Sequence, residues 1–180
     1  MLREYLSPIL ETIKIILLAL LIVMPIRYFL FQPFIVKGQS MEPGVVSGDY
    51  LIVDEITYRF REPVRGEVIV FKYPFNPSHR YIKRIIGLPG EKVEIRNGKV
   101  YINGKPLNES TYLPPGTETP GEIEMVLREN EYFVLGDNRI ASADSRTWGP
   151  LPRKNIIGRA IIRAWPLDAL AKFSAPFYQF

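Results

Sequence analysis

The chain contains no cysteine and only one histidine among its 180 residues. Without cysteine it can have no disulfide, no thiol nucleophile and no cysteine-ligated metal, and one histidine cannot make a multi-histidine zinc site. His79 lies in the turn-rich stretch 76–80, where an exposed loop histidine is commoner than a catalytic base. We therefore predict neither a metal nor another cofactor, and we expect any hydrolytic chemistry to work without histidine.

Charge of one sign is nowhere concentrated in the sequence. The chain has 23 basic and 19 acidic side chains and a net charge of +4. Residues 1–36 carry three basic and two acidic groups, which leaves 20 and 17 for residues 37–180. Nucleic-acid-binding proteins usually have a basic patch, arm or tail. Because the sequence has no such arm or tail, we expect no nucleic-acid partner.

One long apolar run extends over residues 9–31, and its centre, 15–26, has no charged residue. As a helix, ~23 residues at ~1.5 Å each would cross a ~30 Å hydrocarbon layer, with Lys14 and Arg27 extending toward water. A buried core helix of this kind needs a larger protein around it, and a cleaved signal peptide needs small residues where Arg27 and aromatic residues stand. We therefore predict an uncleaved membrane anchor within residues 1–33.

After residue 33 the sequence changes to short β-type runs separated by turn signals. These runs are 50–53, 67–73, 80–86, 92–96, 99–102, 132–135 and 156–165. Asn97-Gly98, between two of the runs, predicts a two-residue hairpin turn. The polar stretch 106–122 is rich in proline and glycine and predicts a loop. Since no soluble helix is indicated, residues 34–180 should form a mostly antiparallel β domain.

Three segments of this domain carry side chains suited to catalysis. Ser40 lies in a loop soon after the apolar run, and the loop 136–149 holds two carboxylates, two arginines and two serines. Lys83 lies in a predicted strand, where it shares a face with Tyr81 and Ile85, an apolar setting for an ammonium group. Taken singly, each feature also has an ordinary structural interpretation. Ser40 is typical of a turn serine, the loop 136–149 of a turn closed by Asp–Arg pairs, and Lys83 of a solvent-facing strand lysine.

A serine and a lysine can form a nucleophile and its base. A serine hydroxyl needs an adjacent base to react, and in a chain with one loop histidine a neutral amine is the remaining candidate. An ordinary lysine, with a pKa of ~10.4, is neutral in only about one molecule in 2,500 at pH 7. Burial against apolar groups lowers that pKa. The apolar face predicted for Lys83 therefore suits a general base.

In order and spacing, the motifs resemble those of the bacterial type I signal peptidases over nearly the whole chain. After the apolar run they are Ser40-Met41-Glu42-Pro43, Gly48-Asp49, Arg80-Tyr81-Ile82-Lys83-Arg84, Gly87-Leu88-Pro89-Gly90, Gly136-Asp137-Asn138-Arg139 and Ser142-Ala143-Asp144-Ser145-Arg146. The resemblance implies a membrane-bound serine endopeptidase with a Ser/Lys dyad. It also implies a β domain of the signal-peptidase type with a single N-terminal transmembrane helix.

The resemblance assigns roles to individual residues. It implies that Ser40 is the nucleophile, that Lys83 is the general base and that Ser142 orients the base. Asp144 and Arg146 correspond to a supporting salt bridge. The substrate-binding positions correspond to Phe34, Val36, Met41, Tyr81 and Ile82.

Three positions, Gly38, Gly44 and Ala141, depart from the family's commonest pattern, and Gly38 is the most informative. At Gly38 some members have a serine whose hydroxyl helps to bind the oxyanion. Because that donor is missing here, the oxyanion hole should consist of backbone amides, above all that of Ser40.

The resemblance further implies a substrate and a location. Family members cut exported preproteins after small residues at the first and third positions before the bond. The expected partners are therefore preproteins with signal peptides, the lipid bilayer and, by proximity, the export translocon. Residues 1–33 would form the cytoplasmic N-terminus and anchor in the bacterial plasma membrane. Residues 34–180 would form the catalytic domain on the outer side, with a short accessory region at about 91–135.

Two other functions fit parts of the sequence. A self-cleaving repressor or mutagenesis protein can use a similar Ser/Lys β core, but it needs a DNA-binding helical domain or a soluble tail where the apolar run lies. A non-enzymatic, membrane-anchored β module would leave Ser40 and Lys83 without a role. A lysine that titrates normally would favour the second alternative.

Overall fold

The computed structural model describes residues 11–21, 23, 31–176 and 178. Residues 11–21 are helical. No helix among the described residues is long and apolar enough to cross a membrane. Much of the anchor predicted within residues 1–33, namely 1–10, 22 and 24–30, lies outside the described part of the chain.

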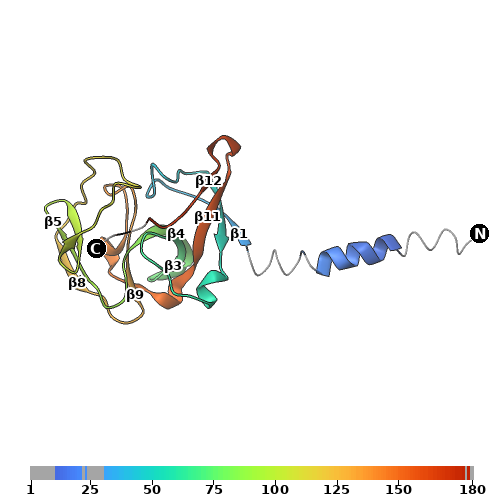
Figure 1. The fold of residues 1–180 in the computed structure, drawn as a ribbon, viewed down its shortest axis with the longest axis horizontal. Helices are drawn as coiled ribbons and strands as arrows, with labels where there is room; N and C mark the ends of the chain where they lie inside the picture. The colour runs from blue at the N-terminus through green and yellow to red at the C-terminus, as the bar shows by residue number, and fades with distance from the viewer. Residues whose placement is uncertain (1–10, 22, 24–30, 177, 179–180) are drawn as a thin grey trace, which may run out of the picture.

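The strands of the described chain form two antiparallel sheets. The main sheet has eight strands in the order β1-β2-β11-β3-β4-β9-β10, with β12 paired to β11. Its strands are β1 (Phe31–Ile35), β2 (Tyr50–Asp54), β3 (Val68–Tyr73), β4 (Asn76–Gly87), β9 (Glu131–Leu135), β10 (Leu151–Pro152), β11 (Ile156–Trp165) and β12 (Ala171–Lys172). In Figure 1, β3 and β4 lie between β11 on one side and β9 on the other.

The second sheet is smaller and lies within the region expected to be accessory. Its order is β7-β6-β5-β8. Its strands are β5 (Lys92–Arg96), β6 (Lys99–Ile102), β7 (Lys105–Pro106) and β8 (Ile123–Val126). In Figure 1, β5 and β8 lie at one end of the domain and β1 lies at the other.

The prediction of a mostly antiparallel β domain is confirmed. The helical elements found beside the strands are short and were not predicted. They are η1 (Thr57–Arg59), α2 (Ser145–Trp148), η2 (Arg153–Asn155) and η3 (Leu167–Ala169). The Asn97-Gly98 turn joins β5 to β6 in a hairpin, as predicted, with both residues at positive φ.

Strand β4 separates two hydrophobic clusters because side chains alternate along a strand. Ile85 belongs to a cluster formed with residues of β3 and β9, whereas Ile86 belongs to one that also includes the buried residues of the small sheet. Both isoleucines are fully buried. Lys83 is two residues before Ile85 on the same strand, so the alternation that fills the core also sets the direction of the lysine side chain.

The two sheets meet closely at Gly87, the last residue of β4. A Cβ added there would lie 2.5 Å from Val93 Cγ2 and 2.8 Å from Leu127 Cδ1. Both of these neighbours are buried in the cluster shared by the sheets. The contact therefore requires glycine because of space and not because of backbone conformation.

We predict that Gly87→Ala lowers the free energy of unfolding by about 1–3 kcal/mol, because the extra methyl overfills a packed core. Gly44→Ala is the control, since a Cβ there meets its nearest atom, Asp137 Oδ2, at an ordinary 3.6 Å. The control should change stability by no more than about 0.5 kcal/mol. Urea unfolding of the two variants measures the difference, and equal effects would contradict the packing argument.

Candidate active site

Ser40 and Lys83 are in direct contact although 43 residues separate them. Lys83 Nζ lies 2.6 Å from Ser40 Oγ and 2.8 Å from the carbonyl oxygen of Ile82. Lys83 is only 4% exposed, and its Nζ lies 5.6 Å from the centre of the Tyr81 ring. The structure thus brings together the two side chains that the sequence predicts to react.

The loop that carries Ser40 is fastened at both ends. The Val36 amide donates to Asp49 O and the Gly48 amide donates to Val36 O, each at 2.9 Å. Between these bonds, Met41 and Val45 are buried in a cluster with Val36. Because the buried side chains of Val36, Met41 and Val45 hold the loop against the core, packing keeps the Ser40 hydroxyl directed toward Lys83.

Burial changes the acid–base chemistry of Lys83. Its pKa is lowered from 10.5 to a net value of about 8. Desolvation by burial lowers the pKa, and the nearby carboxylates of Asp144 and Asp137 raise it and so partly oppose the effect of burial. A pKa of about 8 leaves about a tenth of the amine neutral at pH 7. The side chain is therefore suited to accept a proton near neutral pH.

The loop 136–149 lies against the serine. The Asn138 amide donates to the Ser40 carbonyl oxygen at 3.1 Å. A Cβ on Gly136 would collide with that same carbonyl oxygen and with Ser142 Oγ. Close contact between the two loops therefore requires glycine at position 136, the first residue of the Gly-Asp-Asn-Arg motif.

Ser142 is placed beside this contact. Its hydroxyl is buried and has no hydrogen-bond partner within the described residues, so it makes no bond to Lys83 here. The backbone amide of Ser40 also makes no hydrogen bond within that part of the chain. One hydroxyl and one amide are thus left available next to the reactive pair.

Asp144 and Arg146 form the pair that the sequence predicts. Asp144 is fully buried, and its carboxylate accepts two bonds of 2.8 Å from the Arg146 guanidinium. It also accepts from the Gly136 amide at 3.0 Å. As the N-cap of α2, it accepts a further bond from the Arg146 amide. The carboxylate of Asp144 therefore joins Gly136, the first residue of the loop 136–149, to Arg146 near its other end.

A cavity of about 350 Å³ opens beside Ser40 and Lys83. Four of the five predicted substrate-binding residues line it: Phe34, Val36, Tyr81 and Ile82. The fifth, Met41, is 1% exposed and packs into the core behind the serine, because it is adjacent to Ser40 and faces the opposite way. Ala141 and Ala143 line the cavity and were not predicted, although their alternation around Ser142 is a signal for it.

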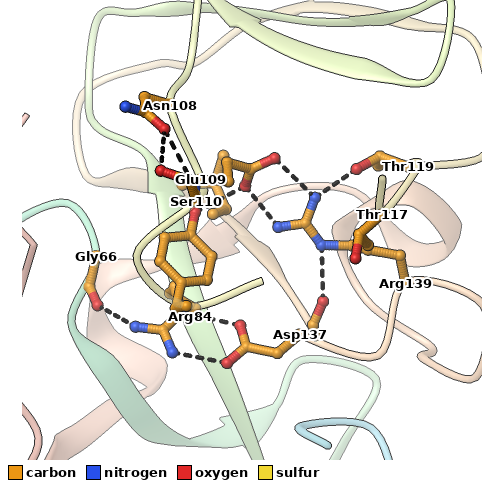
Figure 2. A network of polar contacts seen from close by, with 12 residues as sticks. Gly66, Arg84, Asn108, Glu109, Ser110, Thr117, Thr119, Asp137 and Arg139 are labelled. Atoms are coloured by element: carbon orange, nitrogen blue, oxygen red, sulfur yellow. Dashed lines mark hydrogen bonds and ion pairs between the residues drawn. The ribbon is translucent and has the colours of Figure 1, made fainter. Parts of the chain in front are cut away.

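Sequence reasoning also missed a network of buried ion pairs, shown in Figure 2. The Arg84 guanidinium, next to Lys83 on β4, binds Asp137 through two bonds of 2.9 and 2.6 Å and donates to Gly66 O at 2.8 Å. Arg139 binds Glu109 in the stretch 106–122. Of the arginines and acids in the loop 136–149, only Asp144 and Arg146, the pair implied by the resemblance, bind each other.

His79 is exposed on β4. Among residues 11–21, 23, 31–176 and 178, no group of three or more potential ligands is placed to hold a metal ion.

Comparisons with known proteins agree on one family. The sequence model described as signal peptidase, peptidase S26, matches residues 9–165. Signal peptidase I of Leptolyngbya laminosa is 42% identical over 178 residues, which cover 94% of this chain and 86% of that protein. Signal peptidase I P of Bacillus subtilis subsp. natto is 36% identical over 174 residues, 91% and 93% of the two chains. A solved signal peptidase I from Enterococcus faecalis V583 is 34% identical, covers 55% of this chain and 97% of that chain, and has a TM-score of 0.48.

We predict that Asp144→Asn lowers the pKa of Lys83 below its value of about 8, because the carboxylate of Asp144 raises that pKa. The variant should also lose about 3 kcal/mol of stability, since Arg146 loses its buried partner. A titration followed by NMR of ¹³C-labelled lysine measures the pKa. Asp168→Asn, an exposed aspartate, is the control and should leave it unchanged. An unchanged or higher pKa in the Asp144 variant would show that the two charges are not coupled.

Proposed function

The chain belongs to the signal peptidase family, peptidase S26, and from that premise we propose that it is a serine endopeptidase that removes signal peptides from preproteins. In this proposal Ser40 is the nucleophile and Lys83 is the general base. The observation that carries this proposal is the 2.6 Å contact between Lys83 Nζ and Ser40 Oγ in a buried setting. The repressor-like alternative is set aside because the matching family is that of the signal peptidases.

The reaction begins with proton transfer from the serine. The neutral amine of Lys83 accepts the hydroxyl proton as Ser40 Oγ attacks the peptide carbonyl. The Ser40 amide, which has no partner in the described chain, donates to the oxygen that gains negative charge. Lys83 then gives its proton to the leaving amine. The C–N bond breaks and an acyl-enzyme remains, which water hydrolyses with the same amine as base.

Ser142, Asp144 and Arg146 support this chemistry. The Ser142 hydroxyl is buried without a partner, so it can accept a bond from the protonated amine and fix its direction. Asp144 and Arg146 hold the loop on which Ser142 lies. These three residues are therefore positioning residues and take no part in bond making.

The substrate lies as an extended strand beside residues 81–83 of β4. Alternate side chains of such a strand point the same way, so the first and third residues before the bond enter the 350 Å³ cavity and the second does not. The walls formed by Phe34, Tyr81 and Ile82 are apolar and leave room for small side chains. This accounts for cleavage after small residues.

The lipid bilayer is the second partner that we propose. In helical residues 11–21, large apolar side chains such as Ile15, Leu17 and Leu21 are 67%, 60% and 72% exposed. So much exposed apolar surface on one helix suits hydrocarbon better than water. We place the N-terminus in the cytoplasm of a bacterial cell and residues 34–180 on the outer side of the plasma membrane, close to the translocon that delivers preproteins.

Lys83→Arg should lower kcat/KM by about 10³-fold or more, because a guanidinium stays protonated and cannot accept the serine proton. Lys83→Met should be equally inactive yet no less stable at pH 7, since it removes a buried ammonium without leaving a partner charge. Cleavage of a purified precursor, read by mass spectrometry of the new N-terminus, measures the first effect. A Lys83→Arg enzyme of near-native rate would rule out the lysine as base.

The pH profile of the native enzyme provides a separate measurement. The active form has Lys83 deprotonated, so kcat/KM should fall as the pH drops through the pKa of about 8 and level off above it. An acid limb centred near pH ~10.4, the ordinary lysine value, would contradict the proposal and favour the non-enzymatic alternative.

Substitution in the substrate tests the extended-strand geometry. Replacing alanine by phenylalanine at the first position before the bond should abolish cleavage, because the side chain must enter the cavity. The same change at the second position should alter kcat/KM by no more than about threefold, since that side chain points away. Equal sensitivity at both positions would exclude the extended-strand model.

A further inference from the structure

A second and larger cleft, of about 860 Å³, opens next to Glu42 and Pro43, which follow Ser40 in the serine loop. Its walls are formed by Glu42 and Pro43, by residues 137–140, and by residues 114 and 116–122 together with Gly98 in the turn between β5 and β6. None of these residues lines the cavity assigned to the signal peptide. The mechanism described above leaves this cleft without a role.

The two cavities share the serine loop and the loop 136–149 as walls. The serine loop lines the first cavity up to Ser40 and the second from Glu42 onward. The opposite loop lines the second with residues 137–140 and the first with Ala141 and Ala143. The bond from the Asn138 amide to Ser40 O joins the loops between the cavities. The two cavities therefore lie on either side of this contact between the loops, near Ser40.

The outer wall of this cleft is held in place. Arg139 is fully buried and binds both carboxylate oxygens of Glu109, and it also donates to Thr119 Oγ1. The Thr119 amide donates to Gly98 O at 2.8 Å. Figure 2 shows Arg139 between Glu109 and Thr119. The stretch 106–122, which the sequence predicts to be a loop, is thus fastened over the cleft.

The charges that line the cleft are not balanced. Asp137 and Arg139 are each paired, with Arg84 and Glu109. The other three charged residues of the lining are Glu42, Glu118 and Glu122, and none of their carboxylates has an ion-pair or hydrogen-bond partner in the described chain. A cleft with uncompensated negative charge attracts cations and repels anions at short range.

We propose that this cleft binds the segment of the preprotein on the carboxyl side of the scissile bond, and that its carboxylates favour basic over acidic side chains there. The inference rests on the proposed function, which assigns the signal peptide to the smaller cavity. Only the segment after the bond remains to fill the larger one. The enzyme would then select preproteins by their residues on both sides of the scissile bond.

Four reporters with the same residues before the bond test the proposal. Three are peptides that differ only at the second to fourth positions after it, with lysine, glutamate or asparagine there. The fourth carries aminomethylcoumarin directly after the bond and so has nothing to place in the cleft. With native enzyme, kcat/KM should be about fivefold or more higher for the lysine peptide than for the glutamate peptide, and the ratio should approach one at 1 M salt.

Charge reversal at the rim supplies the decisive comparison. The double variant Glu118→Lys, Glu122→Lys should invert the preference between the two peptides and leave cleavage of the coumarin reporter unchanged. Glu129→Lys is the matched control, an exposed glutamate outside the cleft, and should leave the ratio as in the native enzyme. Melting curves of both variants confirm that they are folded.

The outcomes separate the two proposals. If the native enzyme cleaves the reporters but shows no preference, or if both variants change the ratio equally, the cleft does not bind the segment after the bond and the inference is overturned. If none of the four reporters is cleaved, the proposed function is overturned and the inference with it. If the preference is inverted in the double variant and not in Glu129→Lys, the cleft binds the segment after the scissile bond.

Discussion

The burial of one amino group is the constraint on which the rest of the structure depends. Lys83 is 4% exposed, and its pKa is lowered from 10.5 to about 8 mainly by desolvation. A shift of that size corresponds to about 3 kcal/mol against the ammonium form. The fold must therefore hold a group that would be more stable in water. It does so from β4, an interior strand of the main sheet, which pairs with β3 at Lys83 and with β9 from Arg84 onward.

Two aspartates lie close enough to Lys83 to raise its pKa, and each is bound by an arginine. Asp137 pairs with Arg84 and Asp144 pairs with Arg146, while no carboxylate of the described residues lies within ion-pair distance of Lys83. A carboxylate paired directly with the lysine would favour the ammonium and remove the base. The arginines thus serve the chemistry indirectly, because they occupy the carboxylates that would otherwise keep the lysine charged.

The parts of this site that depend on local patterns could be predicted from the sequence. Strand alternation places Lys83 on the face of Tyr81 and Ile85, and the Asn97-Gly98 hairpin follows from turn chemistry. The parts that depend on distant partners could not. Nothing local indicates that Arg139 binds Glu109, 30 residues away, or that this bond fastens a stretch whose composition is typical of a free loop.

Neighbouring residues with opposite directions explain why Met41, unlike the other four predicted pocket residues, does not line the cavity. Met41 follows a serine that faces the cavity, so it turns into the core, where it is 1% exposed. Strands of two residues, such as β10 and β12, have too few side chains to show a period. The four residues of α2 likewise cannot show a helical repeat, although Asp144 is a typical N-cap residue.

The contact between the serine loop and the loop 136–149 links these features. Gly136 lets the second loop approach the Ser40 carbonyl so closely that any Cβ would collide with it. That approach positions Asn138 to bind Ser40 O and places Ser142 beside the reactive pair. Because the Gly136 amide is bound by Asp144 and its carbonyl by Arg139, the two ion pairs converge on this one residue. A shift of either pair would therefore move the serine relative to the lysine, and also the boundary between the two clefts.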